Sequence, residues 1–79
     1  MDSQAVVLSA EAIMQEENMP KQILSAIERI IQILKNSEDV HAKKDKCIHE
    51  LEEIEANGSV EPGIRVLLLD LASALEQMN

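Results

Sequence analysis

Phenylalanine, tyrosine and tryptophan are all absent from this chain of 79 residues. Any hydrophobic core must therefore be filled by aliphatic side chains alone. The surface likewise has no aromatic ring on which a nucleic-acid base, a sugar or a polyproline ligand can stack. Recognition modes that depend on such stacking are excluded.

Basic residues are also scarce, because only seven lysines and arginines accompany fifteen acidic residues, and the net charge is −8. Phosphate backbones and anionic lipids repel a chain of this charge. The N-terminus lacks the basic segment of a signal peptide, and no apolar run approaches the roughly 20 residues that cross a bilayer. We expect neither direct nucleic-acid binding nor membrane binding.

Cysteine, glycine and proline are each rare. The single cysteine, Cys47, excludes an intrachain disulfide and agrees with a cytoplasmic location. Two glycines and two prolines predict long helices joined by short loops. A chain this short buries only about 60% of its unfolded surface, which allows one core. Residues 1–79 are therefore predicted to form a single helical domain.

Aliphatic residues at helical spacing dominate the sequence, and hydrophobic residues make up 46% of it. The spacing predicts four helices, at about residues 4–17, from the Pro20 turn to 35, 37–57 and 59–77. Ser3 and Ser37 are the expected N-caps of the first and third helices. The Asn57-Gly58 pair is expected to end the third helix in the left-handed conformation.

The second and third predicted helices differ in how much apolar surface they offer. The second has one continuous apolar face, formed by Ile23, Ala26, Ile27, Ile30, Ile33 and Leu34 and flanked by Leu24 and Ile31. The third has a thin apolar stripe of Val40, Cys47, Ile48, Leu51 and Ile54. We therefore expect the third helix at the edge of the fold, with a wide solvated face.

An internal match appears when the chain is shifted against itself by 41 positions, which aligns Ile23 with Ile64 and pairs many other apolar residues. We interpret this match as two tandem helix-turn-helix hairpins, at about 3–36 and 37–78. The predicted fold class is all-α, a four-helix bundle, with a HEAT-like repeat as the alternative. A chance alignment of two amphipathic hairpins also explains the match.

The match fails at Val66 and Leu69, which take the places of Ser25 and Glu28. The two polar residues are expected to face solvent, so the fourth helix is apolar on two sides. Because helices that are apolar all round are buried, one prediction places it centrally, with the first helix covering Val66 and Leu69. The other prediction makes these two residues a contact with another chain.

Residues able to bind a metal gather in the third helix, where Asp45, His49 and Glu53 follow one another at intervals of four. This spacing places a histidine between two carboxylates on one helical face. A di-metal bundle instead needs inward Glu-x-x-His motifs from several helices, and the inward stripes contain no acid. We expect a solvated charged face with no metal and no cofactor.

Catalytic residues are not expected either. Neither His41 nor His49 neighbours a serine or aspartate in a way that marks a catalytic pair, and no glycine-rich loop is present to bind phosphate. Cys47 lies on the apolar stripe, where a cysteine acts as a small inert hydrophobe. Arg65 is expected to pair on the surface with Glu61, one helical turn earlier.

The two proline turns and the C-terminal tail carry a resemblance to a known family. Residues 17–23, 59–65 and 65–76 resemble short archaeal helical proteins that are classed only as uncharacterised. That family has a Val-Pro or Met-Pro turn before its second and fourth helices and a Leu-Glu pair near its end. This chain departs from it by lacking an arginine at residues 22–24. The resemblance implies a compact archaeal, cytosolic bundle and no activity.

Taken together, these features predict a small, acidic, non-enzymatic scaffold or protein-interaction module. The candidate contact residues are Val66 and Leu69, and the expected partner is another protein or a second copy in a homodimer. A metal- or small-ligand-binding bundle that uses the His49 region is the alternative function. An enzyme subunit that is active only in a complex is a further alternative.

Overall fold

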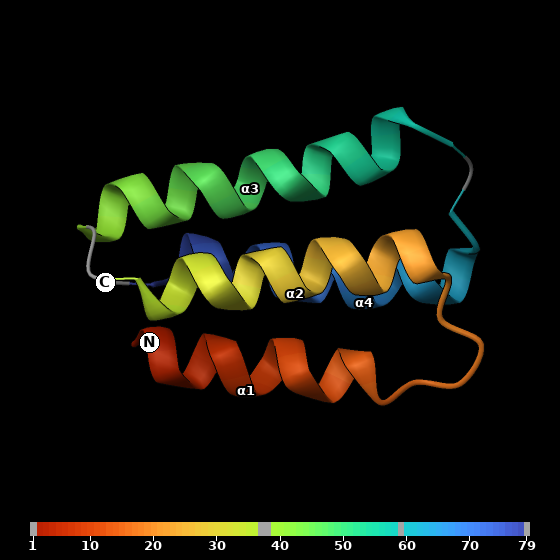
Figure 1. The fold of residues 1–79 in the computed structure, drawn as a ribbon, viewed down its shortest axis with the longest axis horizontal. Helices are drawn as coiled ribbons and strands as arrows, with labels where there is room; N and C mark the ends of the chain where they lie inside the picture. Colours follow the sequence, from red (N-terminus) through yellow and green to blue (C-terminus); the bar gives the residue numbers. More distant parts are fainter. Residues whose placement is uncertain (1, 37–38, 59, 79) are drawn as a thin grey trace.

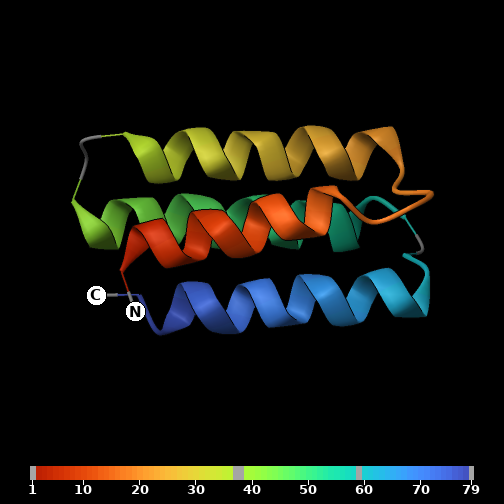
Figure 2. The ribbon, with the colours of Figure 1, turned by 90° about the horizontal axis from the view of Figure 1, so that it is seen from below.

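The computed structural model describes residues 2–36, 39–58 and 60–78. Its four helices are α1 (Ser3–Met14), α2 (Lys21–Lys35), α3 (Val40–Ala56) and α4 (Pro62–Glu76). Successive helices run in opposite directions, as Figures 1 and 2 show. The predicted all-α four-helix bundle is confirmed.

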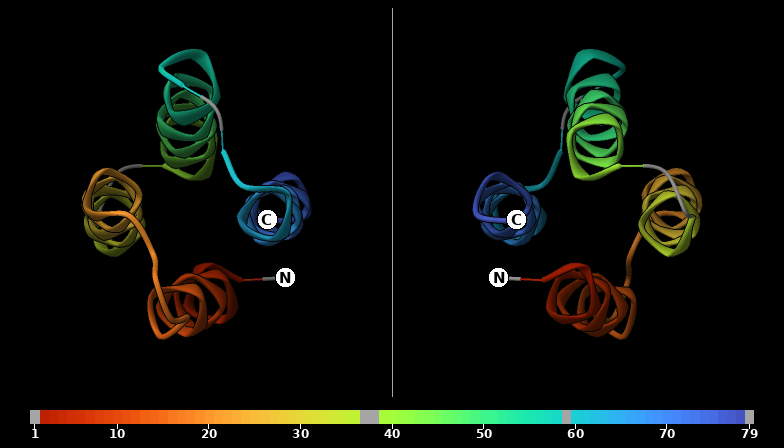
Figure 3. Two further views of the ribbon diagram at one scale, coloured as in Figure 1. Left: turned by 90° about the vertical axis from the view of Figure 1, so that its right-hand side faces the viewer. Right: turned by 90° about the vertical axis from the view of Figure 1, so that its left-hand side faces the viewer.

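The four helices form a ring when viewed along their axes (Figure 3). Each helix packs against two neighbours, and the contact between α1 and α4 closes the ring. This closure distinguishes the bundle from the open stack of a HEAT-like repeat. Contacts of α2 with α1 and α3 are more extensive than those of α4 with the same two helices.

Helix α1 begins and ends at different residues from those predicted. Its N-cap is Asp2, whose carboxylate accepts a hydrogen bond from the backbone N–H of Ala5 at 2.9 Å. Ser3 is instead the first helical residue, because the preceding carboxylate already satisfies a free N–H of the first turn. The helix stops at Met14 rather than Glu17, and Asn18 then adopts a left-handed conformation with φ of 61°.

The ends of α3 also correct the prediction. Asp39 caps the helix by accepting from the N–H groups of His41 and Ala42 at 2.8 and 3.2 Å, and the expected cap Ser37 lies outside the described residues. Asn57 has φ of −93°, and its N–H bonds the carbonyl of Glu53, so the helix ends without a left-handed residue. Gly58 does not have a positive φ either.

The two prolines occupy different positions at the starts of their helices. Pro62 is the first residue of α4, where the fixed φ of proline suits the helix and its missing N–H loses no bond. Pro20 lies one position earlier, at the N-cap of α2, with extended backbone. Both turns are short, so each proline directs the chain into the next antiparallel helix. Ser59, expected near the start of the fourth helix, is outside the described residues.

The core is aliphatic throughout, and none of the described polar or charged residues is buried. Helix α2 supplies the largest share, namely Ile23, Ala26, Ile27, Ile30, Ile31 and Leu34. Ile33, predicted for this face, is only half-buried, whereas the flanking Ile31 is buried. Helix α3 contributes only Cys47 and Leu51 as buried residues, which agrees with its expected edge position.

The 41-residue shift carries the bounds of α2 onto those of α4. Helices α1 and α3 do not correspond in this way, since they contain 12 and 17 residues. The internal repeat therefore stays a prediction. Among the described helices, none combines the length and the apolar character needed to cross a membrane.

Candidate functional site

Val66 and Leu69 lie on the side of α4 that faces away from the bundle, and we call this pair the α4 outer face. Their side chains are 56% and 54% exposed. The inward side of the same helix carries Ile64, Leu68 and Leu71, which are buried. The prediction that α1 covers Val66 and Leu69 is therefore wrong, because α1 packs beside α4 rather than across its outer side.

The equivalent positions of α2 are polar. Ser25 and Glu28 are exposed there, as expected from the amphipathic pattern. Exposed apolar residues on α4 thus occupy places where the other hairpin has a hydroxyl and a carboxylate. Burying them would be favourable, at about 25 cal/mol for each Å² of apolar surface removed from water.

A third exposed apolar residue, Leu8 on α1, was missed by sequence analysis. It is 59% exposed. At about 100° per residue it lies opposite Val6 and Ala10, so the helical period of α1 could have identified it. Leu8 belongs to a neighbouring helix and lies outside the α4 outer face.

Arg65 contributes a charge at the edge of the α4 outer face. In the described part of the chain it forms no ion pair with Glu61, contrary to the prediction. The Glu61 carboxylate instead turns over Gly63, where its Oε1 lies 3.4 Å from the position that a Cβ would take. The guanidinium is exposed to solvent.

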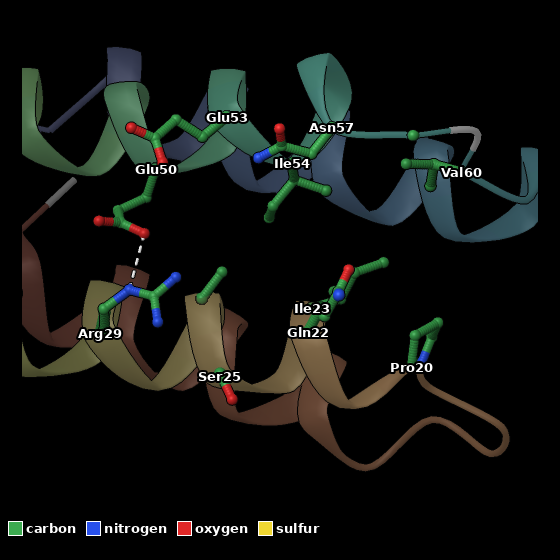
Figure 4. Close-up of a pocket in the computed structure, with 12 residues that line it drawn as sticks. Pro20, Gln22, Ile23, Ser25, Arg29, Glu50, Glu53, Ile54, Asn57 and Val60 are labelled. Carbon is green, nitrogen blue, oxygen red and sulfur yellow. Dashed lines mark hydrogen bonds and ion pairs between the residues drawn. The ribbon is translucent and has the colours of Figure 1, made fainter.

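A groove runs between the first half of α2 and the last half of α3 (Figure 4), and we call it the α2–α3 groove. Its volume is about 430 Å³. The apolar residues that line it are Pro20, Ile23, Ala26, Ile54 and Val60. Ile54 and Val60 reach into it from α3 and the following loop, opposite Ile23.

An ion pair closes one end of this groove. The Nε of Arg29 donates to Oε1 of Glu50 at 2.9 Å and thereby joins α2 to α3. No local sequence pattern predicts this pair, because the two residues are 21 positions apart and lie on different helices. Glu53 of α3, and Asn57 and Gly58 just after the end of that helix, continue the rim.

The metal-ligand candidates of α3 form a pair rather than a cluster. Nε2 of His49 lies 2.8 Å from Oε1 of Glu53, and both side chains are exposed. Within residues 2–36, 39–58 and 60–78, no three histidine, cysteine or acidic side chains lie together in a way that could hold a metal ion. Asp45 is exposed and adds no third ligand to this pair.

Cys47 is fully buried between α3 and α2. Its thiol lies 3.8 Å from the carbonyl oxygen of Ile30, to which it donates a weak hydrogen bond. Burial, and to a smaller degree the nearby Glu50 carboxylate, raises the pKa of the thiol to about 11. A thiol of this pKa stays protonated at neutral pH, so it is a poor nucleophile and metal ligand.

The sequence model of the Uncharacterised protein family (UPF0147) matches residues 2–78, which include all four helices. No curated protein and no solved structure matches the chain. The description of the family names no activity.

Proposed function

The chain belongs to the UPF0147 family of uncharacterised proteins, and we propose that it is a non-enzymatic module that binds a partner protein through the α4 outer face. The observation that carries the proposal is the exposure of Val66 and Leu69, each more than half open to solvent. Exposed apolar pairs on one helical face are typical of helix-mediated protein contacts. An archaeal and cytoplasmic origin is part of the same proposal.

Electrostatics favours a basic partner over a second copy of the chain. Two copies would each carry a net charge of −8 and repel one another. A stable interface buries about 800 Å² on each partner, which is more surface than two side chains offer. Residues around Val66 and Leu69 must therefore also contact the partner. A partner that adds its own basic residues around an apolar strip gains attraction where a homodimer gains repulsion.

Light scattering and affinity capture test the proposal together. We expect the purified chain to be a monomer and to retain a basic protein when tagged and captured from the cells that produce it. The Val66→Ser/Leu69→Glu double variant should lose that protein, whereas Ser25→Thr/Glu28→Gln, at the equivalent sites of α2, should keep it.

Two results would contradict the proposal. Capture that is equal for both double variants would show that the α4 outer face is not the contact. A wild-type dimer that dissociates in the Val66→Ser/Leu69→Glu variant would replace the basic partner with self-association. Circular dichroism identifies any variant that has lost its helices.

The alternative function, binding of a metal or small ligand near His49, has a separate test. The 2.8 Å His49 to Glu53 contact offers two ligands, whereas protein sites for transition metals generally use three or more. We expect elemental analysis of the purified protein to find no stoichiometric metal. Metal that is present at one equivalent and lost in His49→Ala would overturn the interaction-only proposal.

A further inference from the structure

The α2–α3 groove exists because the two helices diverge. They are close where the small Cys47 side chain packs against the carbonyl of Ile30. Toward the C-terminal end of α3 they separate, as Figures 1 and 3 both show. There the larger Ile23 and Ile54 side chains face each other across the groove. A chain with no aromatic residue has no side chain of its own with the bulk to fill this space.

The floor of the groove is suited to an apolar side chain from outside. Ile23 and Ala26 are buried beneath it, and Ile54 and Val60 are only partly covered by the protein itself. The volume of about 430 Å³ falls within the range of pockets that bind ligands in proteins. An entering apolar group would cover the exposed parts of Ile54 and Val60.

The rim of the groove favours a cation. Arg29 is paired with Glu50, and the exposed carboxylate of Glu53, which contacts His49 at 2.8 Å, leaves the lining with one more acidic than basic residue. The last turn of α3 contains no basic residue, and its carbonyl groups form the negative end of the helix dipole. Glu52 and Glu55 extend the negative charge along the same turns.

We infer that the α2–α3 groove binds a basic segment of a protein, with one large apolar side chain on the floor and a lysine or arginine beside Glu53. The ligand needs both features: an apolar side chain to cover the floor, and a basic side chain to pair with the acidic rim. The site is separate from the α4 outer face, since no α4 residue lines the groove.

A synthetic hexapeptide of sequence KRWLKR provides the probe. The chain contains no tryptophan, so the emission of the peptide reports binding without background. We expect saturable binding, and we expect the acidic peptide EDWLDE to bind at least about tenfold more weakly. Amide signals of Ile54 and Val60 should shift in NMR spectra on addition of KRWLKR, and those of Leu69 should not.

Two charge reversals on α3 separate a local site from general attraction to an acidic protein. Glu53→Lys and Glu52→Lys change the net charge equally, but only Glu53 lines the groove. We expect Glu53→Lys to weaken KRWLKR binding about fivefold more than Glu52→Lys does. Glu53→Gln, which keeps the shape of the side chain, should weaken binding in the same direction.

A dissociation constant above about 1 mM for KRWLKR would overturn the inference, because binding would then be too weak to be specific. Equal weakening by Glu53→Lys and Glu52→Lys would also overturn it, as would shifts centred on α4. The Val66→Ser/Leu69→Glu variant should bind KRWLKR as the wild type does. This variant therefore distinguishes loss of binding at the groove from loss of binding at the α4 outer face.

Discussion

The side chain of Cys47 is the one titratable group of the described residues that lies fully inside the core. Its small size permits the close approach of α3 to α2, and its S–H finds an acceptor in the carbonyl of Ile30. Sequence analysis placed this residue on the apolar stripe, and burial confirms that placement. The raised pKa follows from the same burial, because the thiolate would lose its hydration there.

Folding stability should therefore fall at alkaline pH through Cys47. The pKa of the thiol rises on folding from 9.0 to about 11, so its stabilising effect is complete below pH 9 and is lost as the pH rises through 11. The loss at pH 11 should be about 2 kcal/mol of unfolding free energy. Urea titrations of the wild type and Cys47→Ala at pH 8 and pH 11 measure it.

The variant Cys47→Ala controls for the other effects of alkaline pH, because it keeps every other titratable group of the chain. The wild type should lose more stability between the two pH values than Cys47→Ala does. An equal loss in both proteins would show that the thiol is not buried as described. Slow alkylation of the native thiol, and fast alkylation in urea, gives an independent check.

At the scale of single elements, α2 was the most predictable helix and α1 the least. The apolar residues of α2 recur every three or four positions, so most of its buried face and its end at Lys35 follow from the pattern, although Ile31 rather than Ile33 is buried. The helical pattern of α1 continues as far as Glu17, but the helix ends at Met14, with Gln15 as its C-cap, and the chain then turns through a left-handed Asn18. Such a choice depends on how the turn reaches Pro20, which the pattern does not encode.

The two candidate sites depend on how the helices are arranged in space, so the sequence predicted only some of their residues. The pattern identified the second apolar side of α4 at Val66 and Leu69 but could not decide whether α1 covers it. The α2–α3 groove arises from the divergence of two helices, and the Arg29 to Glu50 pair arises from their packing. Neither feature leaves a local signal in the sequence.

Matched leucine truncations on α4 measure the difference between its two sides. Leu71 is 1% exposed, so Leu71→Ala should lower the unfolding free energy by about 2 to 5 kcal/mol. Leu69→Ala makes the same chemical change at an exposed position and should alter it by no more than about 0.5 kcal/mol. Chemical denaturation of both variants compares them, and equal losses would mean that Leu69 is covered in solution.

At the scale of the whole molecule, the bundle combines a net charge of −8 with two solvent-exposed apolar surfaces. One is the α4 outer face and the other is the α2–α3 groove, and they lie on different helices. Like charges repel and exposed apolar surface favours contact, so under the proposed function a basic partner is favoured over a second copy of the chain. We propose that this combination suits a small adaptor that binds basic proteins and is monomeric when alone.

Photo-cross-linking from position 69 tests the central claim, contact of the α4 outer face with a protein, most directly. A photoreactive benzoylphenylalanine replaces Leu69 in one variant and Glu28, its equivalent on α2, in another, and both are irradiated in the cells that produce the protein. The account predicts a discrete adduct with a basic protein from position 69 and none from position 28. No adduct at position 69, equal adducts from both positions, or a cross-linked dimer of this chain would contradict it.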